Sequence, residues 1–427
     1  MGTLNAPKGY GRRPNRLRIL WIKANKLLPL HSGGSIRSYN ILRQLAVHND
    51  VTLFSYYEGA PDAKYENELT RLFPRAVCLC TGTRFLGRGL DYLLRFPLQP
   101  PYAVARFKSA AVRSRIQASL REKRFDVAVC DFLDAAINFP ASSDIPAVLF
   151  QHNVESEIWR RHVLTAINPA RRLIYGVEFM KMLHYEQRAV RRFDHVIAVS
   201  GHDRKLMSAW TDASRITIVP TGVDLQQFQP SPSLRTTGKP LVLFVGAMDW
   251  EPNIDAAEYF CREIWPSILA KVPTAQFRIV GRDPVRRVQE LISRSVEVTG
   301  SVTSVVDHLH EAAVVVVPLR VGGGTRLKIY EAMAAGKAVV STAIGAEGLD
   351  VHPGQDIVLA DEPVAFADAV ITFLQDGELR LRYEQAAASL AARYDWAAIG
   401  DKFGSVLESL VSRTIAGADT SAPHTPR

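Results

Sequence analysis

The sequence predicts two α/β domains in series, each built on a parallel β-sheet with helices on both faces. Strand-like apolar segments alternate with helix-like segments along nearly all of the chain. This alternation restarts after a stretch rich in Pro, Ser and Thr at residues 226–240. The chain has 427 residues, which is too many for one ordinary domain and enough for two that each bury a core.

The first domain is expected over residues 16–225, after a basic extension at 1–15. A strand at 17–24, a glycine loop, a helix at 35–46 and a strand at 51–55 form one βαβ unit. Further strands are expected at 76–80, 126–130, 147–151, 195–200 and 216–219, and a long basic helix at 171–192.

The second domain is expected over residues 241–395, after a linker at 226–240. Its strands are expected at 241–245, 276–280, 313–317, 338–341 and 356–359, and its helices at 254–269, 284–293 and 325–334. A helix at 396–413 is expected to pack near the interdomain region, followed by a disordered polar tail at 414–427. Ligands are expected at the carboxyl ends of the strands, as in other parallel sheets.

The composition is typical of a soluble globular protein, with 47% hydrophobic and 22% charged residues. No apolar run approaches the ~20 residues of a membrane-spanning helix. The apolar stretch near the N-terminus is brief and contains Lys23 and Lys26, so no signal peptide is expected. The four cysteines show neither metal-site spacing nor a CxxC pair, which favours a reduced, cytoplasmic protein.

The net charge of +9 conceals an asymmetry between the two halves. Residues 1–240 contain 35 Lys and Arg against 19 Asp and Glu, a net +16, whereas residues 241–427 contain 17 against 24, a net −7. No segment resembles a nucleic-acid-binding module, so nucleic acid is not expected as a partner. The basic half either faces an anionic membrane or phosphate-bearing acceptor, or is a solvated surface, and the sequence leaves both open.

The strongest motif is VPLRVGGGTRLKIYE at residues 317–331, where a strand, a glycine loop and a helix follow in order. Consecutive glycines allow close backbone approach to a ligand, and their N–H groups with the helix start favour an anion. Arg326 and Lys328 can approach a diphosphate from two flanks, and the carboxylate of Glu331 can accept hydrogen bonds from a ribose diol. The predicted anion-binding loop therefore comprises Gly322, Gly323, Gly324 and Thr325.

Two further segments follow strands of the first domain. Gly33 and Gly34 can direct backbone N–H groups toward a phosphate or sugar, although such a loop is often only a tight turn. His152 lies at a strand's carboxyl end, where its side chain can bind a substrate hydroxyl. Glu155 and Glu157 suit the start of the next helix.

No feature of the sequence predicts a metal site. No Asp-x-Asp pair or histidine cluster stands at a strand end, and Asp131 and Asp134 are interpreted as capping or surface residues. A leaving diphosphate would then be stabilised by cations and backbone N–H groups, with no metal or other cofactor.

The segments HSGGSIRSYNILRQLA, QHNVE, TGVD, GAMDWEPN and GGGTRLKIYEAMA together resemble glycosyltransferase family 4, retaining enzymes with the GT-B fold. The resemblance covers nearly the whole chain and is closest to a subgroup associated with exopolysaccharide synthesis. It implies two Rossmann-like domains facing across a cleft, with the acceptor in the first and the nucleotide sugar in the second. It also implies that Glu331 holds the donor ribose, that His152 lies near the transferred sugar, and that Gly300 and Val302 lie near the nucleobase.

The chain departs from the family pattern at two places. The family often has two glutamates with seven residues between them, and Gly323 stands at the first of these positions. The family also often has an arginine and a lysine after the first strand of the second domain, and here those positions are Ala247 and Pro252. We expect Arg326 and Lys328 to replace these cations, and Asp249 or Asn253 to contact the sugar.

The resemblance implies a metal-independent hexosyltransferase that retains the anomeric configuration of a nucleotide sugar. The sequence shows no obvious nucleophile, which favours a same-face displacement in which Arg326, Lys328 and the loop amides stabilise the departing diphosphate. The acceptor is expected to be a glycan or a lipid-linked glycan, in polysaccharide or glycoconjugate biosynthesis. Two alternatives remain, an inactive nucleotide-sugar sensor and a GT-B nucleotide-sugar epimerase.

Overall fold

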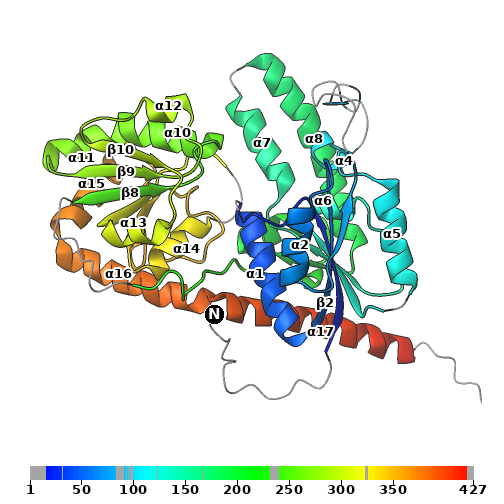
Figure 1. The fold of residues 1–427 in the computed structure, drawn as a ribbon. Helices are drawn as coiled ribbons and strands as arrows, with labels where there is room; N and C mark the ends of the chain where they lie inside the picture. Colours follow the sequence, from blue (N-terminus) through cyan, green and yellow to red (C-terminus); the bar gives the residue numbers. More distant parts are fainter. Residues whose placement is uncertain are drawn as a thin grey trace, which may run out of the picture.

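A computed structural model describes residues 16–30, 32–82, 91–92, 94, 96, 100–122, 124–166, 168–230, 240–322 and 326–420. Two α/β lobes stand side by side, and the helices α16 (Gly377–Ala391) and α17 (Trp396–Thr420) run along one side of both (Figure 1). The chain thus forms the two α/β domains that the sequence predicts.

The first lobe contains a seven-stranded parallel sheet in the order β3-β2-β1-β4-β5-β6-β7. Apolar residues form these strands because both faces of a parallel sheet are covered. The strands are β1 (Arg18–Ala24), β2 (Asp50–Tyr57), β3 (Val77–Cys80), β4 (Val127–Asp131), β5 (Ala147–Phe150), β6 (His195–Ala198) and β7 (Ile216–Ile218). The strand order reverses between β1 and β4, where parallel sheets bind ligands.

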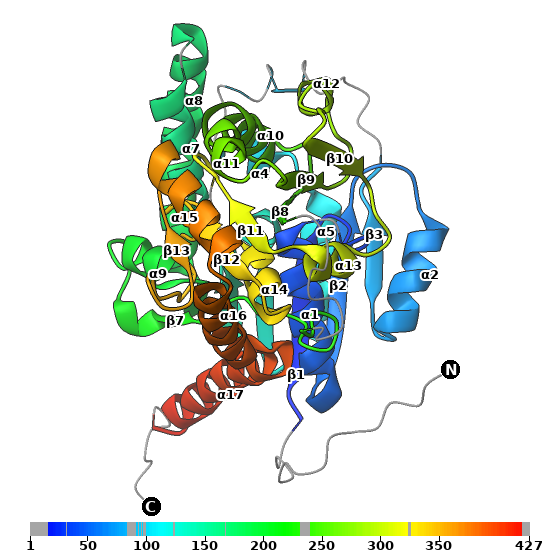
Figure 2. The ribbon, with the colours of Figure 1, turned by 90° about the vertical axis from the view of Figure 1, so that its left-hand side faces the viewer.

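Helices cover both faces of this sheet. One core contains side chains of α1 and α17, and the other contains side chains of α5, α6 and α8. The helices are α1 (Gly33–His48), α2 (Ala63–Leu72), α4 (Tyr102–Ala105), α5 (Ala110–Arg121), α6 (Leu133–Ala136), α7 (Glu155–Thr165), α8 (Pro169–Arg192) and α9 (Gly201–Met207). α7 and α8 pack together as a hairpin whose tip projects beyond the lobe (Figures 1 and 2).

The second lobe contains a six-stranded parallel sheet in the order β10-β9-β8-β11-β12-β13. Its strands are β8 (Leu241–Val245), β9 (Gln276–Val280), β10 (Val296–Gly300), β11 (Val314–Val317), β12 (Ala338–Ser341) and β13 (Val358–Leu359). Its helices include α10 (Glu251–Tyr259), α11 (Trp265–Lys271), α12 (Arg286–Gln289), α13 (Val305–Glu311), α14 (Leu327–Ala334) and α15 (Pro363–Gln375). The strand order reverses between β8 and β11, as it does between β1 and β4 in the first lobe.

Some predicted elements differ from those observed. The helix expected at 254–269 is interrupted by a π-turn at Phe260–Ile264, next to Pro266, which lacks the N–H that a continuous helix needs. The helix expected at 284–293 is a single turn, α12. β10 and α13 were not predicted.

The chain returns to the first lobe through α17. The rings of Trp21 in β1 and Phe150 in β5 lie 5.5 and 5.1 Å from that of Phe403, measured between centroids. α17 also packs closely on α1, because a Cβ added to Gly400 would lie 2.3 Å from the Cβ of Gln44. The helix continues to Thr420, so the predicted disordered tail begins too early, and residues 421–427 lie outside the described part.

None of the described helices has the length and hydropathy needed to span a bilayer.

Candidate functional site

A cavity of about 730 Å³ lies where the carboxyl ends of the two sheets face each other. The first lobe lines it with the residues after β1, β4 and β5 and with the first turn of α1. The second lobe lines it with the residues after β8 and β9 and with the start of α14. Most of the candidate residues described by the structure line this cavity: Gly33, Gly34, His152, Asp249, Asn253, Arg326, Lys328 and Glu331.

Gly33 and Gly34 lie within the first turn of α1 rather than in a loop before it, so the predicted helix start at residue 35 is too late. Ser32 is the N-cap, and its hydroxyl oxygen accepts a hydrogen bond from the N–H of Ser35. A Cβ at Gly33 would lie 3.4 Å from Leu327 in the other lobe, and one at Gly34 would lie 3.4 Å from His152 Nδ1. Both glycines therefore let α1 approach the cavity closely.

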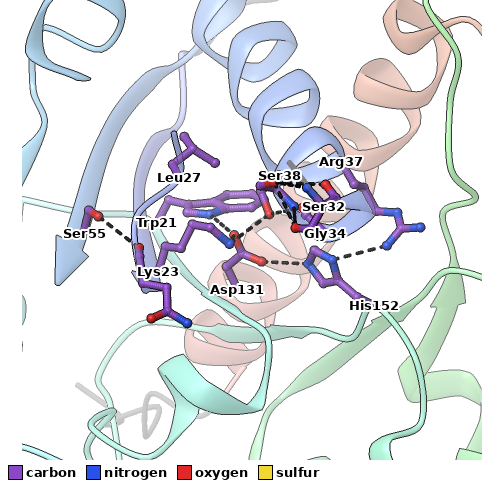
Figure 3. Close-up of polar contacts among 12 residues, drawn as sticks. Trp21, Lys23, Leu27, Ser32, Gly34, Arg37, Ser38, Ser55, Asp131 and His152 are labelled. Atoms are coloured by element: carbon purple, nitrogen blue, oxygen red, sulfur yellow. Dashed lines mark hydrogen bonds and ion pairs between the residues drawn. The ribbon is translucent and has the colours of Figure 1, made fainter. Parts of the chain in front are cut away.

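A buried polar network forms the first-lobe side of the cavity (Figure 3). Asp131, the last residue of β4, accepts a hydrogen bond from Trp21 Nε1 at 3.1 Å and pairs with Lys23 Nζ at 3.0 Å. Its second oxygen lies 2.7 Å from His152 Nε2. His152 Nδ1 lies 3.2 Å from Arg37 Nη1. The network connects β1, β4, the segment after β5, and α1.

The protonation state of His152 follows from these contacts. Arg37 can only donate, so His152 Nδ1 accepts and Nε2 carries the proton that it donates to Asp131. Burial lowers the pKa of His152 to about 4 despite the neighbouring carboxylate, so the ring is neutral at pH 7. Burial opposes ionisation of Asp131, but Lys23 and His152 hold its pKa well below its usual range.

The interpretation of Asp131 and Asp134 as capping or surface residues was wrong. Asp131 is only 1% exposed, and both residues line the cavity. Burial raises the pKa of Asp134 to about 6. The sequence contains the signal that was missed, because Asp131 ends a buried strand just as His152 follows one. Lys23 and Arg37 were likewise not singled out.

On the second-lobe side, Lys328 lies beside the segment after β8, the segment in which the family often has its two cations. Its Nζ donates to Asn253 Oδ1 at 2.9 Å, and Asn253 Nδ2 donates to the carbonyl oxygen of Ala247 at 2.9 Å. The ammonium lies 4.7 Å from the centroid of the Phe244 ring. Gly246 makes room for it, because a Cβ there would lie 2.9 Å from Lys328 Nζ.

Arg326 and Lys328 both reach the cavity from the start of α14. Burial lowers the pKa of Lys328 to about 7, and Arg326 adds to this effect. Burial also raises the pKa of Glu331, one turn along α14, to about 7, although Lys328 acts in the opposite direction. Two cations at the start of α14 therefore lie at the cavity, where they can accept an anionic ligand.

The other candidate residues pair with a neighbouring charge, lie outside the cavity lining, or lie outside the described residues. Asp249 lies at the cavity and pairs with Arg282 at 3.1 Å, so it is already engaged by a cation. Gly300 and Val302 lie at the end of the edge strand β10, outside the cavity lining. Gly322 precedes the lining segment and has a φ of +124°, which favours glycine. Gly323, Gly324 and Thr325 lie outside the described residues.

Comparisons with known families match both lobes. Residues 31–227 match a family model described as Glycosyltransferase Family 4, and residues 239–376 match one described as Glycosyl transferases group 1. The two matches together cover most of the chain.

Curated relatives match part or most of the chain. The phosphatidyl-myo-inositol mannosyltransferase of Mycolicibacterium smegmatis is 30% identical over 211 residues, which cover 47% of this chain and 52% of the relative. The enzyme of the same description from Mycobacterium tuberculosis is 29% identical, with 47% and 54% covered. The chain therefore spans about half the length of these mannosyltransferases. An uncharacterized 44.6 kDa protein in the cps region of Klebsiella pneumoniae is 21% identical, with 83% and 90% covered.

Solved structures confirm the fold class. The structure of Anabaena HepE in complex with UDP and glucose superposes with a TM-score of 0.66 at 15% identity, covering 92% of this chain and all of HepE. Sucrose-phosphate synthase from Thermosynechococcus elongatus gives 0.70 at 18% identity, with 93% and 100% covered. The predicted GT-B arrangement of two parallel α/β sheets is thus confirmed.

Proposed function

Since the chain belongs to glycosyltransferase family 4, we propose that it is a retaining enzyme that moves a sugar from a nucleotide-sugar donor to an acceptor hydroxyl. One observation carries this proposal. The cavity between the lobes brings Arg326, Lys328 and Glu331 of the second lobe opposite the His152–Asp131 network of the first. Cations for a diphosphate and polar groups for a sugar thus share one site.

The second lobe binds the donor in this proposal. Glu331 accepts hydrogen bonds from the ribose diol, and Arg326 and Lys328 hold the diphosphate. The complex of HepE with UDP and glucose supports a nucleotide-sugar donor, because that protein has the same fold. The cavity volume of about 730 Å³ accommodates a ligand of this size.

The chemical step is a same-face displacement at the anomeric carbon. The bond from that carbon to the diphosphate oxygen breaks, and a bond to the acceptor oxygen forms on the same face. The acceptor proton passes to the departing phosphate, whose negative charge Arg326 and Lys328 stabilise. His152, neutral and fixed by Asp131, orients the sugar at the reacting face.

We place the reaction in polysaccharide or glycoconjugate biosynthesis, with a glycan or lipid-linked glycan as acceptor. The similarity to a protein of the Klebsiella pneumoniae cps region supports this placement, because it extends over 83% of the chain.

A nucleotide-sugar epimerase is the second candidate. Such an enzyme needs carboxyl or imidazole groups in the cleft besides His152, and Asp134, whose pKa is raised to about 6, is such a group. An inactive sensor is less well supported, since Arg326, Lys328 and Glu331 all line the cavity.

Turnover of radiolabelled nucleotide sugars separates these functions. We expect the label to pass to a glycan or lipid-linked acceptor fraction. Little free labelled sugar should be released when the acceptor is omitted. Transfer should persist in excess EDTA, because Arg326 and Lys328 supply the positive charge at the diphosphate. Conversion to an epimer without acceptor would support the epimerase, and binding without turnover would support the sensor.

We also propose that the first lobe contacts an anionic membrane through the α7–α8 hairpin. A groove of about 950 Å³ along these helices is lined mainly by apolar side chains, including Val163, Leu173, Val177 and Met180. Leu173 and Met180 are 71% and 60% exposed. Exposed arginines of α8 accompany them, namely Arg171, Arg172, Arg188 and Arg191. Basic and apolar groups on one helical hairpin suit an anionic bilayer, where a lipid-linked acceptor would lie.

Liposome flotation tests this membrane contact. The protein should float with phosphatidylglycerol-containing vesicles and not with phosphatidylcholine alone, and binding should fade with salt. The double substitution Leu173→Asp and Met180→Asp should abolish binding. Val364→Asp in α15, an equally exposed apolar position of the acidic lobe, should not affect it. Equal flotation of the double variant and wild type would contradict the proposal.

A further inference from the structure

Arg161 lies in α7, a helix whose start is hydrogen-bonded to the first lobe close to His152. It is in the second turn of α7, a helix that begins three residues after His152. Glu186 of α8 holds the start of α7, because its carboxylate accepts hydrogen bonds from the N–H of Glu155 at 2.9 Å and the N–H of Ser156 at 3.0 Å. Glu186 is fully buried, so this helix start is firmly fixed.

From this position Arg161 reaches across to the second lobe. Its Nη1 and Nη2 each donate to one oxygen of Glu347 at 2.7 Å, in a forked geometry. Nη1 also donates to the carbonyl oxygen of Gly322 at 2.6 Å. Nε donates to Glu157 of its own helix at 3.0 Å. All three guanidinium nitrogens are therefore engaged, two of them across the cleft.

Gly322, whose carbonyl oxygen accepts the hydrogen bond from Arg161, lies next to the guanidinium of Arg326. A Cβ built on Gly322 would lie 2.9 Å from Arg326 Nη2, so the backbone of Gly322 and this guanidinium are in close contact. Burial is the main reason that the pKa of Arg326 is lowered. The negative charge of Glu347 raises this pKa, and the positive charge of Arg161 lowers it. One cluster thus contains Arg161, Gly322, Arg326 and Glu347.

A second first-lobe side chain approaches the same carboxylate. His202 in α9 has its Nε2 3.9 Å from Glu347 Oε1. Glu347 is therefore the point where two helices of the first lobe meet the second lobe.

We propose that Arg161 is an interlobe positioning residue, which fixes the backbone at Gly322 when the lobes close and so sets the position of Arg326 at the donor. The inference rests on the proposed function, because it assigns Arg326 to the donor diphosphate. Arg161 does not touch the substrate in this scheme. It makes donor binding in the second lobe depend on the placement of α7, the helix that follows His152.

The simpler interpretation is an ordinary ion pair at the lobe surface. Isolated exposed pairs contribute little to stability. The pair of Arg161 and Glu347 differs in being forked, in having side chains only 19% and 25% exposed, and in including a backbone carbonyl of the glycine loop. These features predict an effect on donor use that an ordinary surface pair would not have.

The test uses the full-length variants Arg161→Gln, Glu347→Gln and the double variant. Arg160→Gln is the matched control, because Arg160 is adjacent on α7 and pairs with Glu157 of its own helix. Each variant is assayed for kcat and donor KM, for UDP affinity by calorimetry, for lobe closure on adding UDP by small-angle X-ray scattering, and for melting temperature.

We expect Arg161→Gln to lower kcat/KM for the donor about 30-fold, the size of effect typical of hydrogen bonds to a charged group. Glu347→Gln should act in the same direction but less strongly, because Arg161 keeps its hydrogen bond to Gly322. The double variant should be little worse than Arg161→Gln, since Arg161→Gln already removes both cross-lobe contacts. UDP-induced closure should be reduced in all three. Arg160→Gln should stay within about twofold of wild type.

Two results would overturn the inference: equal effects of Arg161→Gln and Arg160→Gln on closure, or a lower melting temperature with unchanged closure and kinetics. Closure and UDP affinity are measured without turnover, so they test Arg161 even for a protein that transfers no sugar. Absence of transfer by wild type with every donor would instead contradict the proposed function.

Discussion

Replacement of Lys328 by methionine is expected to lower kcat for sugar transfer by about 100-fold or more, the usual consequence of removing one preorganised contact to a leaving group's charge. Lys328 approaches the cavity from α14, and its ammonium is held by Asn253 at 2.9 Å. Charge accumulates on the diphosphate as the glycosidic bond breaks. A neutral side chain of similar length keeps the packing and removes only this stabilisation.

The melting temperature provides the control for Lys328→Met. Burial depresses the pKa of Lys328 to about 7, so a charged Lys328 lowers the stability of the folded protein. This cost is complete below pH 7 and disappears only as pH rises to the ordinary lysine pKa of 10.5. Methionine removes the cost, so the variant should melt no lower than wild type. A large loss of stability, or an unchanged kcat in a folded variant, would contradict the assignment.

The lowered pKa of Lys328 also predicts how donor KM of the wild-type protein changes with pH. In the free enzyme Lys328 loses its proton as pH rises through about 7, and a bound diphosphate favours the charged form. Donor KM should therefore rise above pH 7 while kcat at saturating donor changes less. Lys328→Met should lack this rise.

Replacement of Glu331 by glutamine is expected to weaken nucleotide binding about 10- to 100-fold, because hydrogen bonds from the ribose diol to a carboxylate are replaced by bonds to a neutral amide. Calorimetry with UDP and GDP measures the effect. Burial raises the pKa of Glu331 to about 7, so the difference from wild type should be large at pH 8 and smaller at pH 6.

A nucleotide without the diol provides a matched chemical control. Wild type should bind 2′,3′-dideoxyuridine diphosphate at least as weakly as Glu331→Gln binds UDP, and the variant should discriminate less than wild type between the two nucleotides. A purely structural role for Glu331 would appear as a lower melting temperature, with the preference for the ribose diol unchanged.

The strands of both lobes could be predicted closely because buried parallel strands are short apolar runs. Residues 241–245 and 276–280 match β8 and β9 at both ends. β10 was missed because it is an edge strand whose Glu297 is exposed, so its apolar pattern is weak. The π-turn before Trp265 was missed because helical periodicity continues through Pro266.

The candidate site was only partly predictable for a different reason. Glycine runs and cations beside a helix start are local signals, and they identified Arg326 and Lys328 correctly as cavity residues. The buried network depends on contacts between distant segments, such as Trp21 with Asp131, 110 positions apart. The contact of Arg161 with Glu347 spans 186 positions and two lobes, and no local pattern predicts it.

In the proposed mechanism a sugar is transferred in the cavity between the lobes with retention of its anomeric configuration. The most direct measurement is NMR of the product formed from an isotopically labelled nucleotide sugar and a glycan or lipid-linked acceptor. A retaining transferase forms a new glycosidic bond with the anomeric configuration of the donor, and Lys328→Met should form this bond about 100-fold more slowly. An inverted configuration, or an epimerised nucleotide sugar formed without acceptor, would contradict it.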